Sequence, residues 1–289
     1  MDHPNPFPEL TAPRGRRAFL KTSLGTGFAL AVGPVAAQTI TTPSAGLVAG
    51  EVKVPVADGT IPAYRAMPDG GGPFPTMLVI HEIFGVHAWI QDVCRRFAGL
   101  GYYAIAPDLY AREGDATKAD IKTIINNIVP KVPDAQVLSD LDATVAFAKA
   151  SGSADTGRLG ATGFCWGGRQ IWLYAAHAKE LKAAVAFYGI LGGKAAPTSD
   201  TKPRNPIDIG GSITTPVLGL YGGHDDNIPL PLVDAMRAEL AKAKGPSEIV
   251  VYPDAPHGFF ADYRPSYHKA DAEAAWARAQ AWFKDHGVA

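Results

Sequence analysis

One of the two cysteines in this 289-residue chain stands in a glycine-rich turn, GFCWGG, at residues 163–168. An apolar run precedes the turn and a segment with helical periodicity follows it, which gives the form G-x-nucleophile-x-G between a strand and a helix. Glycines allow a turn so tight that the central side chain is forced outward above the end of the sheet. A helix N-terminus beneath Cys165 also favours its thiolate form. We therefore expect Cys165 to be a nucleophile.

Two later apolar runs end in residues that complete a catalytic set, in the stretches YGGHDDNIP and YPDAPHGFF. The chain order nucleophile, acid, histidine is the one that α/β-hydrolases use. We expect His257 to take the proton of Cys165 and to donate it later to the leaving group, while Asp225 orients the imidazole. Asp226 is the alternative acid, although it can instead cap the helix that follows.

The stretch HEIFGV follows the apolar run 76–80 and supplies the next expected function. In the hydrolase arrangement the loop after this strand contributes one oxyanion-hole amide, and the residue after the nucleophile contributes the other. The N–H groups of Ile83 and Trp166 are therefore predicted to hold the negative oxygen of a tetrahedral intermediate. His81 and His87 are six residues apart, which does not fit the i, i+4 spacing of H-E-x-x-H zinc sites, so no metal is expected. The expected reaction needs no cofactor.

Apolar runs alternate with helical patterns over residues 51–289. The alternation predicts a mostly parallel sheet with helices on both faces, and the period-two pattern on both sides of Asp58-Gly59 predicts an antiparallel hairpin at its edge. No internal repeat or linker interrupts this region, which indicates one domain. The expected strands are 76–80, 102–107, 158–164, 182–189, 215–222 and 247–254, and the expected helices are 87–100, 134–150, 168–179, 230–243 and 268–285.

The first 37 residues have the pattern of an export signal. RGRRAFLK contains Arg16 and Arg17, a glycine-broken apolar stretch follows, and small residues stand at the −3 and −1 positions before a cleavage site after Ala37. The arginine pair resembles a twin-arginine signal, which predicts contact with that export machinery and a periplasmic product. The apolar stretch is too short to span a bilayer, so we expect no stable membrane association. Residues 38–50 are expected to be a linker.

The remaining composition excludes several classes of partner and function. Lys and Arg total 27 against 28 Asp and Glu, and only the first twenty residues are basic, so no nucleic acid is expected. Cys94 lies at helical spacing with Ile90, Val93 and Phe97, which predicts a core position and two free thiols. A thiol redox protein would need a resolving cysteine, which this position of Cys94 disfavours.

Five motifs in this order resemble the dienelactone hydrolase family, the cysteine branch of the α/β-hydrolases, over roughly residues 50–287. They are HEIFGV (81–86), APDLYAR (106–112), GFCWGG (163–168), GGHDDNIP (222–229) and APHGFF (255–260). The resemblance implies an α/β-hydrolase fold and the opening of a small lactone or ester through a thioester on Cys165. It also implies that Glu82 contacts the resting thiol and helps to form the thiolate when substrate binds.

The family holds the carboxylate of dienelactone with two arginines, and this sequence matches only one of them. The first maps to Arg112. The second lies four residues after the catalytic histidine, where this chain has Ala261, and Arg264 stands three residues further on. A substrate with one acidic group, or a neutral ester, is therefore as consistent with the sequence as dienelactone. Three aromatic side chains are expected to line the pocket: Phe84, Tyr110 and Phe259.

Other functions stay open at this point. A carboxylesterase or an acyltransferase acting on a different small acyl compound would use the same residues, and a binding protein without catalysis could keep the same fold. We expect a monomer. Apart from the export machinery, its only expected partner is a small ester or lactone substrate.

Overall fold

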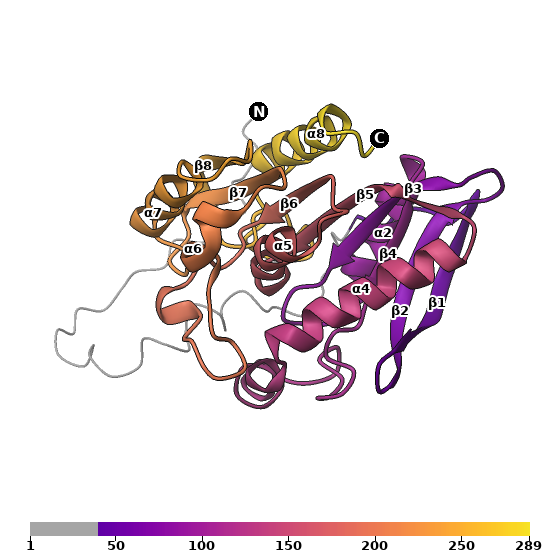
Figure 1. The fold of residues 1–289 in the computed structure, drawn as a ribbon, viewed down its shortest axis with the longest axis horizontal. Helices are drawn as coiled ribbons and strands as arrows, with labels where there is room; N and C mark the ends of the chain where they lie inside the picture. The colour runs from indigo at the N-terminus through magenta and orange to yellow at the C-terminus, as the bar shows by residue number, and fades with distance from the viewer. Residues whose placement is uncertain (1–39) are drawn as a thin grey trace, which may run out of the picture.

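One eight-stranded sheet organises the computed structural model, which describes residues 40–289. The strands lie side by side in the order β1-β2-β4-β3-β5-β6-β7-β8 (Figure 1). They are β1 (Leu47–Val56), β2 (Gly59–Pro68), β3 (Phe74–Ile80), β4 (Tyr103–Pro107), β5 (Ala154–Phe164), β6 (Ala183–Phe187), β7 (Val217–His224) and β8 (Glu248–Pro256). The predicted signal peptide, residues 1–37, and its cleavage site after Ala37 lie outside the described residues.

The pairing of the strands confirms the predicted α/β-hydrolase fold with an antiparallel edge hairpin. β1 pairs with β2, and β2 with β4, in antiparallel fashion, whereas every other neighbouring pair is parallel. The hairpin is longer than predicted, because Leu47 pairs with Pro68 and Gly50 with Arg65. Residues 47–50 therefore belong to β1 rather than to the predicted linker 38–50.

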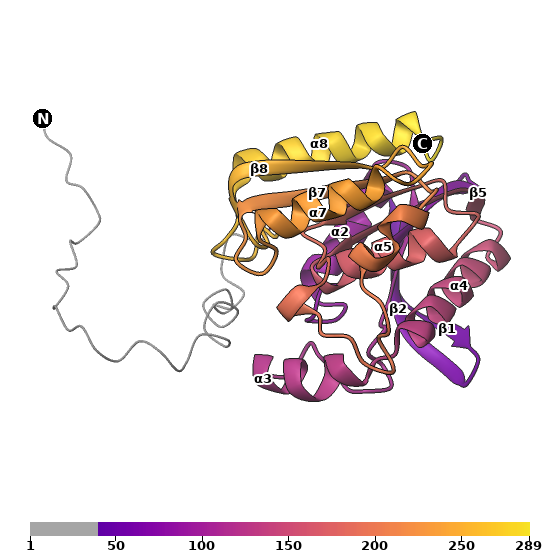
Figure 2. The ribbon, with the colours of Figure 1, turned by 60° about the vertical axis from the view of Figure 1, so that its left-hand side comes forward.

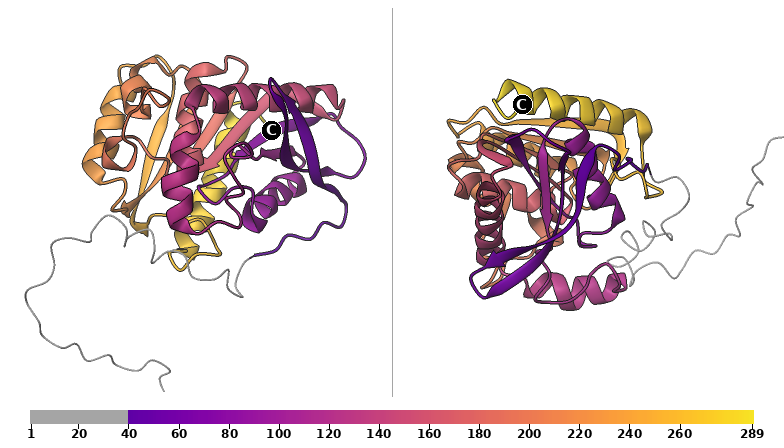
Figure 3. Two further views of the ribbon diagram at one scale, coloured as in Figure 1. Left: turned by 90° about the horizontal axis from the view of Figure 1, so that it is seen from below. Right: turned by 90° about the vertical axis from the view of Figure 1, so that its right-hand side faces the viewer.

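Helices cover both faces of the sheet. On one face lie α2 (Ala88–Gly99) and α8 (Lys269–Asp285), and on the other lie α4 (Asp134–Ala150), α5 (Trp166–His177) and α7 (Leu230–Leu240) (Figures 1 and 3). The ring centroids of Phe97 in α2 and Trp276 in α8 are 4.8 Å apart, which packs these two helices together. β7 and β8 lie between α7 and α8 (Figure 2). Among residues 40–289, no helix combines the length and the apolar character that crossing a bilayer requires.

The loops carry short helical segments that the sequence patterns did not predict. They are α3 (Ile121–Thr123), η1 (Ile124–Ile128), η2 (Val129–Lys131), η3 (Gly193–Ala195), α6 (Pro206–Ile209) and η4 (Gly210–Ser212). The first three follow one another without a gap over residues 121–131, but the change from α to π to 3₁₀ geometry breaks the 3.6-residue period. The other three are about one turn long, which is too short to show a helical period. The predicted helix 168–179 begins two residues earlier, at Trp166, which places its first turn directly after Cys165.

The first described residues are fastened to the loop that follows β8. The N–H of Ile40 donates to Asp262 at 3.2 Å, and the N–H of Thr42 donates to Asp92 of α2 at 2.5 Å. Asp262 is buried, and it also accepts a hydrogen bond from the indole N–H of Trp89 at 3.3 Å. Residues 40–42 therefore form a strap across α2 and the loop after β8.

Candidate active site

The predicted turn around Cys165 has the geometry of a nucleophile elbow. Cys165 lies between β5 and α5 with φ 54° and ψ −112°, a conformation that is rare for a residue with a side chain. A Cβ placed on Gly163 would lie 2.5 Å from the carbonyl oxygen of Gly167. A Cβ on Gly167 would lie 2.4 Å from the carbonyl oxygens of Ile80 and His81. Both glycines are therefore required, because the end of β3, the end of β5 and the start of α5 meet backbone to backbone.

The side chain of Cys165 stands at the carboxyl edge of the sheet, but it is fully buried, with 0% exposure. The expected place above the end of the sheet is therefore found, but the side chain is not exposed there. The side chains that interact electrostatically with Cys165 are Tyr110, Tyr188, His257 and Arg264. The His257 side chain is 10% exposed.

Asp225, rather than Asp226, is the acid that faces the histidine. Its Oδ2 lies 2.7 Å from Nδ1 of His257. Its Oδ1 accepts hydrogen bonds from the N–H groups of Asn227 at 2.9 Å and Ile228 at 3.2 Å, which fix the carboxylate in the turn after β7. Asp225 is buried, whereas Asp226 is exposed. The turn therefore decides between the two adjacent carboxylates, and the structure brings Cys165, His257 and Asp225 together.

The environment of His257 favours its protonated form. Burial alone would lower the pKa of this imidazole, but Asp225 and Cys165 outweigh burial and raise the pKa to about 10. The Asp225 carboxylate accounts for the larger part of this increase. At neutral pH the ring therefore carries a proton between a carboxylate and the sulfur.

Glu82 lies in a buried cluster of charged and polar groups. Its Oε1 accepts hydrogen bonds from the Tyr263 hydroxyl and from Nη2 of Arg264 at 2.5 Å, and Nε2 of His87 is 4.0 Å away. Burial would raise the pKa of Glu82, but Arg264, His87 and Tyr263 together lower it, so the carboxylate is charged. The hydrogen-bonding partners of Glu82 are thus Arg264 and Tyr263 rather than the Cys165 thiol that the resemblance implied.

The two predicted oxyanion-hole amides lie where β3 ends against the start of α5. The contact between Gly167 and the carbonyl groups of residues 80 and 81 brings the Ile83 loop up to the first turn of α5, which begins at Trp166. Within residues 40–289, neither of the two N–H groups donates a hydrogen bond to a protein oxygen. Both are backbone donors at a helix N-terminus or a tight loop, the kind of group that stabilises a developing oxyanion.

His81 fixes the loop that carries Ile83 and has no metal-binding arrangement. Its Nδ1 lies 2.7 Å from the carbonyl oxygen of Glu82, and its Nε2 lies 3.2 Å from the N–H of Leu109. These partners assign the proton to Nδ1, and burial lowers the pKa of the ring, which keeps it neutral. The ring stacks on Trp166 with centroids 5.3 Å apart. His81 therefore ties the β3 loop to the residue after the nucleophile.

Arg112, which the resemblance assigned to the substrate carboxylate, is bound by two carboxylates of the protein. Its Nη2 lies 2.5 Å from Asp58 in the β1–β2 turn, and its Nη1 lies 2.7 Å from Asp140 in α4. These two ion pairs use both edges of the guanidinium. A substrate carboxylate would have to displace Asp58 or Asp140 from Arg112, and substrate binding by this residue stays a prediction.

The three predicted pocket aromatics surround the elbow in different ways. Tyr110 is buried, and its ring centroid is 4.7 Å from that of Trp166. Phe84 is half-buried, with the guanidinium of Arg264 5.2 Å from its ring centroid. Phe259 is fully buried. A ligand-lining role stays a prediction for all three.

Sequence reasoning missed two residues of the site, Tyr188 and Tyr263, and it missed the pairing of Arg264 with Glu82. Tyr188 closes the apolar run of β6 at the same carboxyl edge as the elbow, and this position was the signal that could have identified it. Tyr263 and Arg264 follow His257 in a loop without periodicity. No pattern in the sequence connects them with Glu82, which is more than 180 residues earlier in the chain.

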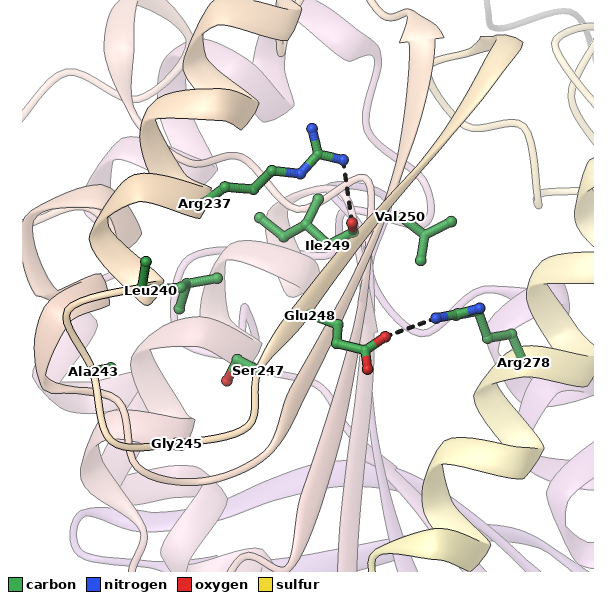
Figure 4. Close-up of a pocket in the computed structure, with 10 residues that line it drawn as sticks. Arg237, Leu240, Ala243, Gly245, Ser247, Glu248, Ile249, Val250 and Arg278 are labelled. Carbon is green, nitrogen blue, oxygen red and sulfur yellow. Dashed lines mark hydrogen bonds and ion pairs between the residues drawn. The ribbon is translucent and has the colours of Figure 1, made fainter.

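One surface hollow among the described residues lies away from this chemistry. It has a volume of about 510 Å³ and lies between α7, β8 and α8 at the amino-terminal end of β8 (Figure 4). In it Arg278 and Glu248 form an ion pair at 2.7 Å, and Arg237 donates to the carbonyl oxygen of Ile249 at 3.2 Å. His257 follows the opposite end of β8. Within residues 40–289, no three His, Cys, Asp or Glu side chains are grouped as ligands for a metal ion.

Comparisons with known proteins agree with the motifs. The model of the dienelactone hydrolase family matches residues 61–287. A protein of Methylorubrum extorquens, provisionally named a carboxymethylenebutenolidase, is 59% identical over 95% of this chain and 94% of its own length. An Escherichia coli K12 protein with the same provisional name is 50% identical over 93% of this chain and 98% of its own. A crystal structure from Klebsiella pneumoniae, provisionally named a dienelactone hydrolase, has a TM-score of 0.79 and 51% identity, and covers 82% of this chain and 98% of its own.

Proposed function

Because this chain belongs to the dienelactone hydrolase family and is an ester-bond hydrolase, we propose that it opens small lactones or esters through a thioester on Cys165. The observation that carries the proposal is the geometry of the elbow. It combines a strained Cys165 at the start of α5 with a His257 that Asp225 holds at 2.7 Å. This is the nucleophile, base and acid set of an acyl-transfer enzyme.

In the first half of the reaction, the sulfur of Cys165 attacks the carbonyl carbon and a C–S bond forms. The carbonyl oxygen becomes negative and accepts hydrogen bonds from the N–H groups of Ile83 and Trp166, each worth about 2.7–4 kcal/mol in comparable sites. The intermediate then collapses to a thioester, and the C–O bond of the ester breaks. The departing alkoxide takes the proton of His257, and in a lactone this oxygen stays attached to the acyl chain.

In the second half, water attacks the thioester and His257 accepts its proton. The raised pKa of His257 depends partly on Cys165, whose sulfur carries no charge once it is acylated. The pKa of His257 therefore falls in the thioester, which makes the neutral ring available as a base. The C–S bond breaks, the acid is released, and the proton on His257 again faces the sulfur.

The charges around the elbow bear on the class of substrate. Ala261 occupies the position of the second carboxylate-binding arginine, and Arg112 is bound by Asp58 and Asp140. Arg264 is the buried cation beside Glu82, and it interacts electrostatically with Cys165. An acidic group of the substrate that pairs with Arg264 would compete with Glu82 for this cation. We propose a small acyl compound with at most one acidic group.

The proposed place of action is the periplasm. The Arg16-Arg17 pair, the short apolar stretch and the small residues before Gln38 support export by the twin-arginine route and cleavage after Ala37. The proposed state is a monomer. N-terminal sequencing of the exported protein and light scattering of the pure protein test these two points.

The test of the proposed chemistry is mass spectrometry of the intact protein during turnover of aryl esters and lactones. Wild type is expected to carry a transient acyl adduct on the peptide with Cys165, and Cys165→Ala is expected to lose turnover. Cys94→Ala is the matched control, because Cys94 is the buried cysteine of α2. Full turnover by Cys165→Ala, or an adduct on another residue, would exclude Cys165 as the nucleophile.

A further inference from the structure

Tyr188 is a buried tyrosine beside the catalytic imidazole that the reaction described above does not use. It follows β6 directly and has no exposed surface. Its ring centroid is 5.1 Å from that of His257, at an interplanar angle of 61°, and 5.6 Å from that of Phe259. The ring thus stands edge-on to the general base, on the same edge of the sheet as Cys165.

The backbone of Tyr188 is held in an unfavourable conformation. With φ 38° it is, besides Cys165, the only residue other than glycine with positive φ within residues 40–289. Its N–H donates to the carbonyl oxygen of Leu220 at 2.7 Å, and a Cβ on the following Gly189 would lie 2.5 Å from the backbone of Gly168. Strain of this kind concentrates at functional sites, where the surrounding structure can maintain it.

Tyr188 and Glu82, which interact electrostatically, each have a buried polar atom without a hydrogen-bond partner in the described part of the chain. Among the described residues, nothing accepts from or donates to the Tyr188 hydroxyl, and nothing donates to Oε2 of Glu82, although both atoms are buried. Burial raises the pKa of Tyr188 well above its usual value, and Glu82 is the strongest of the charges that raise it further. The hydroxyl therefore keeps its proton and lies within electrostatic reach of Glu82. A buried donor and a buried acceptor without partners indicate a group that binds both.

We propose that Tyr188 and Glu82 form a subsite for a hydroxyl group beside the thioester. The Tyr188 hydroxyl donates a hydrogen bond to the oxygen of the bound group, whose own proton is donated to Oε2 of Glu82. The group is either the water that attacks the thioester or a hydroxyl carried by the acyl chain of the substrate. This inference rests on the proposed function, because the subsite is defined by its position beside acylated Cys165.

The experiment compares Tyr188→Phe, which removes only the hydroxyl, with Tyr103→Phe. Tyr103 is also fully buried with an unpartnered hydroxyl, but it lies in β4 beside Arg65. The substrates are 4-nitrophenyl butyrate and 4-nitrophenyl 3-hydroxybutyrate. The burst of nitrophenolate reports acylation, and the steady state that follows reports deacylation.

If the subsite holds water, Tyr188→Phe slows deacylation about five- to tenfold with both esters and leaves acylation unchanged. If it holds a hydroxyl of the acyl chain, kcat/KM falls by a similar factor for the hydroxybutyrate only. Rates for Tyr188→Phe that equal those of Tyr103→Phe in both phases and with both esters overturn the inference. Wild-type turnover of these esters through Cys165 tests the proposed function separately.

A crystal structure of the wild-type protein provides a second measurement that does not depend on how Tyr188→Phe folds. The expected result is one oxygen atom, from water or a soaked 3-hydroxybutyrate, within hydrogen-bonding distance of both the Tyr188 hydroxyl and Oε2 of Glu82. A direct hydrogen bond between Tyr188 and Glu82, with no room for an intervening atom, would overturn the inference.

Discussion

Replacement of Arg264 by methionine tests how much of the stability of this fold depends on charge pairing inside the site. The side chains of Arg264 and Glu82 are 1% and 0% exposed, and they are joined by a 2.5 Å hydrogen bond. Arg264→Met keeps much of the contact with the Phe84 ring but leaves Glu82 as a buried carboxylate without its cation. Removal of one partner of a buried pair costs about 3–5 kcal/mol. For a chain of this size, that corresponds to a fall in Tm of about 6–20 °C.

The double variant Glu82→Met with Arg264→Met distinguishes a lost ion pair from lost packing. With both charges gone there is no unpaired buried charge, so its free energy of unfolding is expected to lie within about 2 kcal/mol of wild type. Lys269→Met is the matched control, because Lys269 pairs with Glu273 where both side chains are exposed, at 73% and 63%. It is expected to change stability little. Urea unfolding followed by circular dichroism at pH 7 measures all four proteins.

The pH dependence of the free energy of unfolding tests the same ion pair independently. The pKa of Glu82 is below its ordinary value of 4.5 in the folded protein, so its contribution to stability is present above pH 4.5 and is lost as the pH falls through the folded pKa. Without Arg264, burial raises the pKa of Glu82, and protonation relieves the penalty in acid. The difference between wild type and Arg264→Met should therefore narrow from pH 7 to pH 4. This reasoning would be refuted if Arg264→Met were no less stable than Lys269→Met. It would also be refuted if the stability difference between wild type and Arg264→Met widened in acid.

Three further outcomes are expected. Gly167→Ala should lower the free energy of unfolding by about 1–3 kcal/mol or more, because its Cβ would overlap the carbonyl oxygens of Ile80 and His81. Gly99→Ala is the control: a Cβ there has nothing within 4 Å, so this variant should melt at the wild-type temperature or slightly above. Equal melting temperatures for the two variants would contradict the prediction. Because the pKa of His257 is raised from 6.5 to about 10, its contribution to stability is complete below pH 6.5 and is lost as the pH rises toward 10. The difference in free energy of unfolding between wild type and His257→Gln should therefore shrink from pH 6.5 to pH 10. A difference that grows over this interval would argue against the raised pKa. Burial raises the pKa of the Cys94 thiol, so iodoacetamide at pH 8 should label Cys94 in urea but not in the native protein, and rapid native labelling mapped by mass spectrometry would show that Cys94 is not in the core.

The residues that the sequence could predict are those whose position follows from the topology. Parallel strands end at one edge, so the apolar runs before Cys165, Asp225 and His257 were enough to place these side chains together. The glycines on both sides of Cys165 predicted the elbow for a local reason, namely the backbone contacts that a Cβ would obstruct. The core position of Cys94 followed from helical spacing alone.

The residues that the sequence could not predict depend on contacts between distant loops. Arg112 is bound by Asp58 and Asp140, and Glu82 is bound by Tyr263 and Arg264, and no spacing rule relates partners from separate loops. The burial of Cys165 was missed as well, because the glycine spacing predicts the turn but not how much of the thiol stays exposed. The choice between Asp225 and Asp226 needed the amides of the turn itself.

The strap formed by residues 40–42 bears on how the protein should be handled in the laboratory. Ile40 is bonded to Asp262, and the next two residues after Asp262 are the ones that hold Glu82. An affinity tag or a truncation that replaces residues 40–42 would therefore disturb the loop that holds the Glu82 carboxylate. Purification tags are better attached after Ala289. A preparation that begins at Ser44 is expected to have a lower kcat/KM than the protein with residues 40–42 in place.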